Sequence, residues 1–163
     1  MARVITFSRH YQTNHPLKGE HTFFVEQIWN GLNKLKLPVP KNKDVPSDFL
    51  WSILPLSNYG DKYHTIRQGY RWKVGDKFSP RVWSAKPYAS KQIIIAPDIE
   101  IKKTWDFSRD LISDKYYLNG HEIDADKLEL IAKNDGLNIE DFKAWLNKPF
   151  LGQVLCWNER IEY

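Results

Sequence analysis

The chain has little cysteine and no long apolar run. Of its 163 residues only Cys156 is a cysteine, which excludes an internal disulfide and a cysteine-based metal cluster. No apolar run approaches the roughly 20 residues that a membrane-spanning helix needs. The first residues, MARVITFSRHYQ, lack the apolar stretch of a signal peptide. We therefore expect a cytoplasmic protein with no membrane partner.

Several enzyme signatures are also missing. The sequence contains no G-x-x-x-x-G-K-[ST], G-x-G-x-x-G, H-E-x-x-H or G-x-S-x-G. His10, His15 and His21 lie in one N-terminal segment, but their spacing offers zinc no fourth ligand. We expect no metal site and no cofactor.

Aromatic residues and basic charge are plentiful. Aromatics make up 14% of the chain, and the net charge is +4. Residues 62–91 hold eight Lys or Arg against one acid, Asp76, whereas the flanking segments are nearly neutral or acidic. This distribution is typical of a surface that faces an anion. A solvated strand edge, on which Lys and Arg discourage aggregation, explains it equally well.

The first part of the chain predicts a strand, a helix and an insertion. The strand is VITF, residues 4–7, and the helix covers residues 21–35, with Thr22 as N-cap and apolar residues at helical spacing. Residues 36–58 hold four prolines and read as an insertion on a single domain, 1–163. Within the insertion, the apolar run FLWSIL is expected to pack over the core.

The remainder predicts strands followed by a helix pair. Strands are expected at 63–67, 76–83 and 91–107, with a bulge or strand end at Pro97. Asn119-Gly120 is the favoured pair for a two-residue hairpin turn. Helices follow, the first capped by Asp124 or Asp126 and the second by Asn138, before a last strand in FLGQVLCWNERIEY. We predict an α+β fold, a mixed sheet or small barrel.

The segment DKYHTIRQGYRWKVGDK, residues 61–77, concentrates reactive side chains. Strand alternation places Thr65 and Arg67 on one face and Ile66 on the opposite, core-facing side. Lys62, at the strand start, is then within reach of the Thr65 hydroxyl. A threonine hydroxyl becomes a nucleophile when a neighbouring base such as a neutral lysine takes its proton. The same residues also suit an ordinary strand surface.

The run Lys62–Arg67 followed by Trp72–Asp76 resembles the core motif of ASCH (activating signal cointegrator homology) domains. The strand Ile5–Phe7, the helix Val25–Gly31 and the closing Phe150–Val154 resemble further family elements in the expected order. So does the late segment from Asp135 to Trp145. The resemblance covers about half of the chain. It implies a PUA-like β-barrel with one helix near the N-terminus and a helix pair before the last strand.

The resemblance also implies RNA-related work. Small bacterial members include amidohydrolases that deacetylate N4-acetylcytidine, and their catalytic Lys and Thr fall on Lys62 and Thr65. Their third catalytic residue is a Glu, where this chain has the shorter Asp135. In this hypothesis Thr65 attacks the acyl carbonyl, Lys62 accepts its proton, and Asp135 protonates the amine or orients Lys62. The expected ligand-binding residues are Tyr63, His64, Arg67, Tyr70, Arg71 and Trp72, with Arg67 on a phosphate or oxyanion and aromatic rings on a base.

Three alternatives to the amidohydrolase stay open at this point. The chain can be a non-catalytic RNA-binding module, or a ribonuclease in which Lys62, His64 and Arg67 handle phosphate and protons. It can also be a protein-interaction domain that uses exposed tryptophans. The expected partner is RNA or a nucleoside or nucleotide ligand, and the sequence leaves the oligomeric state open.

Overall fold

The chain divides into two compact units. The computed structural model describes residues 2–40 and 55–163. Unit 1 comprises Met1–Lys62 and Lys77–Ile99, and unit 2 comprises Tyr63–Asp76 and Glu100–Tyr163. FLWSIL and much of the predicted insertion lie outside the described residues. The assignment of the chain to one domain stays a prediction.

The sheet of unit 1 is built around β3 (Lys77–Trp83). β1 (Arg3–Thr6) pairs with it in parallel, and β4 (Gln92–Ile94) pairs with it antiparallel. The short β5 (Ile99–Glu100) also pairs with β3. Pro97 lies between β4 and β5, so the strand predicted over 91–107 ends there, because proline has no N–H to donate to a sheet.

The helix α1 (Phe24–Lys34) covers the core of unit 1. Its residues Ile28 and Leu32 are buried, and the Trp29 indole donates a hydrogen bond of 2.6 Å to the carbonyl of Ile95. The helix is confirmed, but the predicted cap is off by one residue. The N-cap is Phe23, and the Thr22 hydroxyl accepts a hydrogen bond of 3.3 Å from the backbone N–H of Phe24.

The sheet of unit 2 is antiparallel, in the order β2, β9, β6, β7, β8. Its strands are β2 (His64–Gln68), β6 (Lys103–Asp110), β7 (Lys115–Leu118), β8 (His121–Glu122) and β9 (Phe150–Cys156). The β7–β8 hairpin turns at Asn119 and Gly120, whose φ angles of 49° and 79° are both positive. A type I′ turn requires this, so the predicted hairpin is confirmed.

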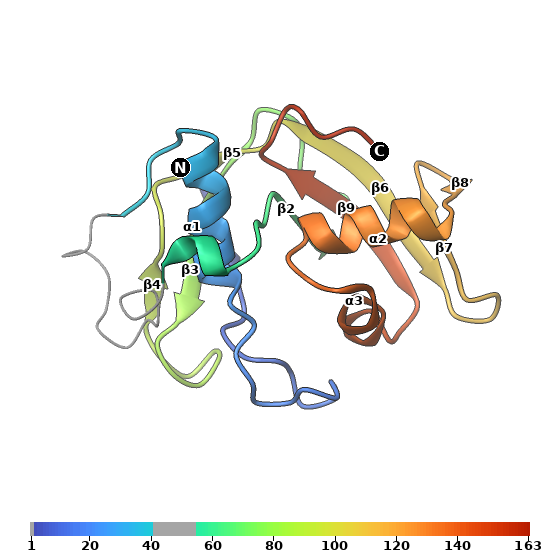
Figure 1. The fold of residues 1–163 in the computed structure, drawn as a ribbon, viewed down its shortest axis with the longest axis horizontal. Coiled ribbons are helices and arrows are strands. Elements are labelled where there is room, and N and C mark those ends of the chain that lie inside the picture. The colour runs from blue at the N-terminus through green and yellow to red at the C-terminus, as the bar shows by residue number, and fades with distance from the viewer. Residues whose placement is uncertain (1, 41–54) are drawn as a thin grey trace. The chain divides into compact units, whose positions relative to one another are not determined.

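The helix pair of unit 2 is confirmed, together with its caps. The Asp124 side chain caps α2 (Ala125–Asn134) by accepting from the N–H of Lys127, and Asn138 caps α3 (Ile139–Trp145) in the same way. The two helices lie against the sheet (Figure 1). The ring of Phe142 in α3 meets the ring of Phe107 in β6 edge-on, with centroids 6.2 Å apart.

The described residues therefore form an α+β protein, as predicted, with three α-helices and two sheets. The predicted barrel is not closed. β1 pairs with β3 and β2 pairs with β9, so the strands join two separate open sheets, and no ladder within the described part of the chain makes a ring. None of the described helices is long and apolar enough to cross a membrane.

Gly152 is the point of closest approach between β9 and β2. A Cβ added to this glycine would lie 2.1 Å from the backbone oxygen of Arg67 and 2.8 Å from the ring of Phe150. Both atoms would therefore lie closer to this Cβ than van der Waals contact allows, and the Arg67 oxygen belongs to the backbone. Only glycine fits here, and this allows β9 to pair with β2.

We predict that Gly152→Ala destabilises the protein by at least about 1–3 kcal/mol, the usual cost of overpacking a filled site. Urea unfolding followed by circular dichroism measures the change. Gly60→Ala is the matched control, because a Cβ there meets nothing within 4 Å and its stability change should stay below about 0.5 kcal/mol. Equal stability of the two variants would contradict the close approach.

Candidate functional site

Lys62 is anchored in unit 1, whereas the other predicted site residues belong to unit 2. Its side chain is only 1% exposed. Its backbone N–H donates to the carbonyl of Gln27 at 3.1 Å. The ammonium nitrogen lies 4.3 Å from the ring centre of Phe24, which is a cation–π contact. Both contacts fix Lys62 against α1.

Asp135 lies beside the beginning of β2. The N–H of Tyr63 donates to the carbonyl of Asn134 at 2.9 Å, which ties the strand to the end of α2. One residue further along each segment, Nδ1 of His64 lies 3.6 Å from Oδ1 of Asp135. The ring of Tyr163 meets His64 edge-on at 5.8 Å, and burial raises the pKa of this tyrosine far above its ordinary value. The group is thus a buried polar cluster.

The register of β2 separates this cluster from Thr65 and Arg67. Side chains alternate along a strand, so Thr65 and Arg67 share the face opposite to His64. Strand alternation in the sequence predicted that Thr65 and Arg67 share a face. Thr65 is buried and Arg67 is half-buried. Ile66, expected in the core, is also only half-buried, because β2 is the end strand of its sheet and pairs with β9 alone among the described strands.

The motif turn, residues 69–75, follows β2 and is held rigidly. The Trp72 backbone exchanges two hydrogen bonds with the Gln153 amide, at 3.2 and 3.1 Å. The N–H groups of Gly69 and Gly75 donate to carbonyls of Leu151 and Ile101. The Trp72 side chain is 7% exposed and serves as an anchor in the core, a position that offers no ring face to a base.

Between these anchors the turn projects Tyr70 and Arg71. Tyr70 is 56% exposed, and Arg71 and Lys73 are exposed as well. The structure therefore sorts the predicted residues into two groups. His64 and Asp135 are brought together in the interior of unit 2, while Tyr70 and Arg71 stand at its surface.

The basic stretch 62–91 is divided between the units. Over the whole sequence, unit 1 carries twelve Lys or Arg against six Asp or Glu, and unit 2 carries twelve against fourteen. Arg67, Arg71 and Lys73 are therefore a local basic group on an acidic unit. The other cations of the stretch contribute to the positive charge of unit 1.

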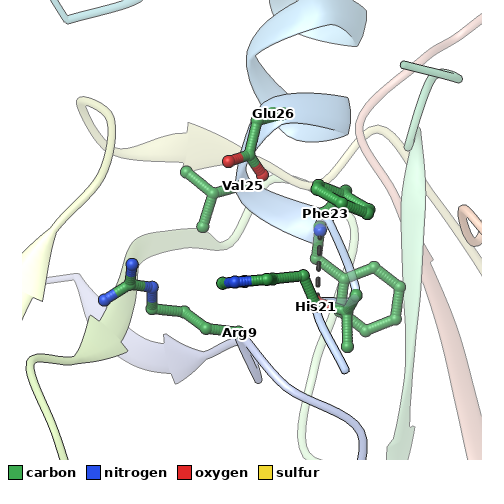
Figure 2. Close-up of a pocket in the computed structure, with 7 residues that line it drawn as sticks. Arg9, His21, Phe23, Val25 and Glu26 are labelled. Carbon is green, nitrogen blue, oxygen red and sulfur yellow. Dashed lines mark hydrogen bonds between the residues drawn. The ribbon is translucent and has the colours of Figure 1, made fainter. Parts of the chain in front are cut away.

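A small pocket beside the start of α1 was not foreseen from the sequence (Figure 2). Arg9, His21 and the carboxylate of Glu26 line it, with Phe23 and Val25. Glu26 is 6% exposed, and burial raises its pKa, which its own backbone N–H, Arg9 and His21 only partly offset. A sequence signal existed, since Glu26 follows two apolar residues on the buried side of an amphipathic helix.

No group of three or more His, Cys, Asp or Glu that could hold a metal ion occurs in the part of the chain that the structure describes. The rings of His10 and His21 do meet, with centroids 4.5 Å apart and planes tilted by 40°. Comparisons with protein-family models, with curated proteins and with solved structures gave no match.

We predict that Glu26→Gln stabilises the protein at pH 7. A carboxyl whose pKa is raised by folding favours the native state most at low pH, and this contribution is lost as the pH rises through the folded pKa. The gain from Glu26→Gln should therefore shrink as the pH falls towards about 4, near the pKa of an unfolded glutamate. Thermal melting across this pH range measures it.

The exposed Glu20→Gln is the control and should change the melting temperature little at any pH. A Glu26→Gln variant that is less stable than the parent protein at pH 7 would show that the carboxylate is stabilised by its partners rather than destabilised by burial.

Proposed function

We propose that this chain is an RNA- or nucleotide-binding protein of the PUA-like ASCH type, which holds its ligand on the motif segment of unit 2. One observation carries the proposal. The motif turn presents exposed Tyr70 and Arg71 on a backbone that is hydrogen-bonded at Gly69, Trp72 and Gly75. A backbone that is held in place before binding loses little conformational freedom when a ligand arrives.

The chemistry of these two side chains suits a nucleotide. A tyrosine ring stacks on any base, because every base has a π face, and arginine pairs with phosphate through its planar fork of donors. Arg67, half-buried at the other end of the segment, and Lys73 add positive charge for the backbone of the ligand. Tyr63 is half-buried and supports β2 through its hydrogen bond to Asn134.

The proposed binding predicts a salt-dependent affinity for RNA. Arg71→Ala should weaken binding of a fluorescein-labelled single-stranded oligonucleotide and lower the slope of log K against log salt by about 0.7, the release expected from one phosphate contact. Tyr70→Ala should weaken binding about 5-fold or more through lost stacking, and change the slope little. Fluorescence anisotropy at several salt concentrations measures both.

Lys148→Ala is the matched control, since Lys148 is an exposed cation of unit 2 remote in sequence from the motif. It should bind as the parent protein does. Unchanged affinity and slope in both Arg71→Ala and Tyr70→Ala would overturn the placement of the ligand on the motif turn.

A second candidate is hydrolysis of an N-acylated nucleoside, favoured by the common face of Thr65 and Arg67 on β2. In this reaction the Thr65 oxygen bonds to the acyl carbon while Lys62 takes its proton. The C–N bond then breaks, the amine leaves with that proton, and water hydrolyses the Thr65 ester. Arg67 stabilises the oxyanion. The role of Asp135, whose Oδ1 lies 3.6 Å from Nδ1 of His64, stays as predicted, to protonate the amine or to orient Lys62.

No comparable observation favours the ribonuclease alternative. His64 has no exposed side-chain surface, and its Nδ1 faces the carboxylate of Asp135. A histidine that transfers protons to a phosphodiester must touch it.

For the hydrolase candidate we predict that Thr65→Val abolishes release of cytidine from N4-acetylcytidine, because valine keeps the shape and lacks the hydroxyl. Thr65→Ser, which retains a hydroxyl, should keep measurable turnover. Liquid chromatography of the products follows the reaction, and melting curves check that both variants fold. Turnover by Thr65→Val at the parent rate, or none by the parent protein, would exclude the hydrolase.

A further inference from the structure

The turn that joins β3 to β4 in unit 1 projects cationic and aromatic side chains. This hairpin turn, residues 84–91, lies in a longer stretch, 77–97, that has four Lys or Arg and no Asp or Glu. Lys86 and Lys91, both within the turn, are exposed. With no acid in the stretch to neutralise them, they give this edge of the sheet a positive potential that attracts anions.

At the tip of the hairpin turn, Tyr88 stands in solvent. It is 89% exposed, and its φ of 62° is in the left-handed region, which a bulky residue seldom adopts. Its ring lies beside the half-buried ring of Trp83, with centroids 5.4 Å apart and planes 48° apart. One indole edge thus steadies a tyrosine ring whose remaining surface is open to water.

The backbone of the hairpin turn is braced by its own hydrogen bonds. The N–H of Ser84 donates to the carbonyl of Lys91 at 2.8 Å, and the N–H of Ala85 donates to Oγ of Ser90 at 3.0 Å. The same hydroxyl donates to the carbonyl of Lys86 at 2.8 Å. The backbone that carries Tyr88 and the two lysines is therefore braced before any ligand binds.

We propose that the hairpin turn of unit 1 is a second nucleic-acid contact, which binds single-stranded RNA. Tyr88 stacks on an unpaired base, and Lys86 and Lys91 contact the phosphates on either side. An exposed ring between two cations matches a chain that alternates bases and phosphates, whereas a duplex keeps its base faces covered. The choice of RNA rests on the proposed function, but the charge and the exposed ring belong to unit 1 itself.

Arg81 adds a cation to the same sheet beneath the hairpin turn. Its guanidinium donates to Ser79 of the same strand at 3.2 Å and to Gln92 of β4 at 3.3 Å. These bonds hold Arg81 half-exposed at the sheet surface. The RNA backbone that leaves Tyr88 therefore meets a further positive charge along β3.

The test measures binding of the full chain to a fluorescein-labelled 12-nucleotide single-stranded RNA and to a duplex of equal length. Tyr88→Ala should weaken single-strand binding about 5- to 100-fold, the range of one lost base stack. Tyr88→Leu keeps apolar bulk without a π face and should weaken it nearly as much. Lys86→Ala with Lys91→Ala should lower the log–log salt slope by about 1.4.

Lys133→Ala with Lys148→Ala is the matched control, two exposed lysines of acidic unit 2, and should leave affinity and slope unchanged. Melting curves confirm that each variant folds. Loss of affinity in Tyr88→Ala, with Tyr70→Ala and Arg71→Ala both unaffected, supports the contact at the hairpin turn and overturns the one at the motif turn. Normal binding by Tyr88→Ala and by the variant with Lys86→Ala and Lys91→Ala overturns the proposed contact at the hairpin turn. If Tyr70→Ala then binds more weakly than the parent protein, the proposed contact at the motif turn is kept.

Three further outcomes overturn this inference. Tighter binding of the duplex than of the single strand would show a contact with phosphates alone. Binding to vesicles with anionic lipids, lost in Tyr88→Ala and unaccompanied by RNA binding, would assign the exposed ring and lysines to a membrane surface. Absence of RNA binding by the parent protein at low salt would overturn both RNA-binding proposals together.

Discussion

The pairing of β9 with β2 is the constraint on which unit 2 depends. β9 is hydrogen-bonded to β2 on one side and to β6 on the other, so it joins the motif strand to the rest of the sheet. At Gly152 the strand comes so close to the carbonyl of Arg67 that no side chain fits. Gln153, the next residue, holds the backbone of Trp72. The position of the motif turn follows from this one strand.

The same pairing decides which motif side chains are buried and which are exposed. Alternation along β2 directs His64 towards Asp135 at the end of α2 and towards the ring of Tyr163. Thr65 and Arg67 are directed to the other face. Trp72, an obvious aromatic candidate in the sequence, is buried, and the less prominent Tyr70 is exposed. Residue type therefore does not show which aromatic side chain of the motif supports the fold and which one solvent can reach.

The two units differ in net charge. Unit 1 holds twice as many basic as acidic residues, while unit 2 has a small acidic excess. A basic stretch that looks continuous in the sequence is thus shared between two bodies. Each of them presents a braced turn with an exposed tyrosine and neighbouring cations, Tyr70 in one and Tyr88 in the other.

The sequence by itself determined the local elements. Helical spacing in α1, the caps Asp124 and Asn138, and the Asn119-Gly120 turn act over a few residues, so their patterns are readable without a fold. It also determined that Thr65 and Arg67 share a face, because alternation is a property of any strand. Only the tertiary structure decided that the strands form two open sheets, and that Asp135 lies against His64. Strand partners and burial depend on residues far apart in the chain, such as Gly152 and Arg67, whose approach leaves no mark in either segment alone.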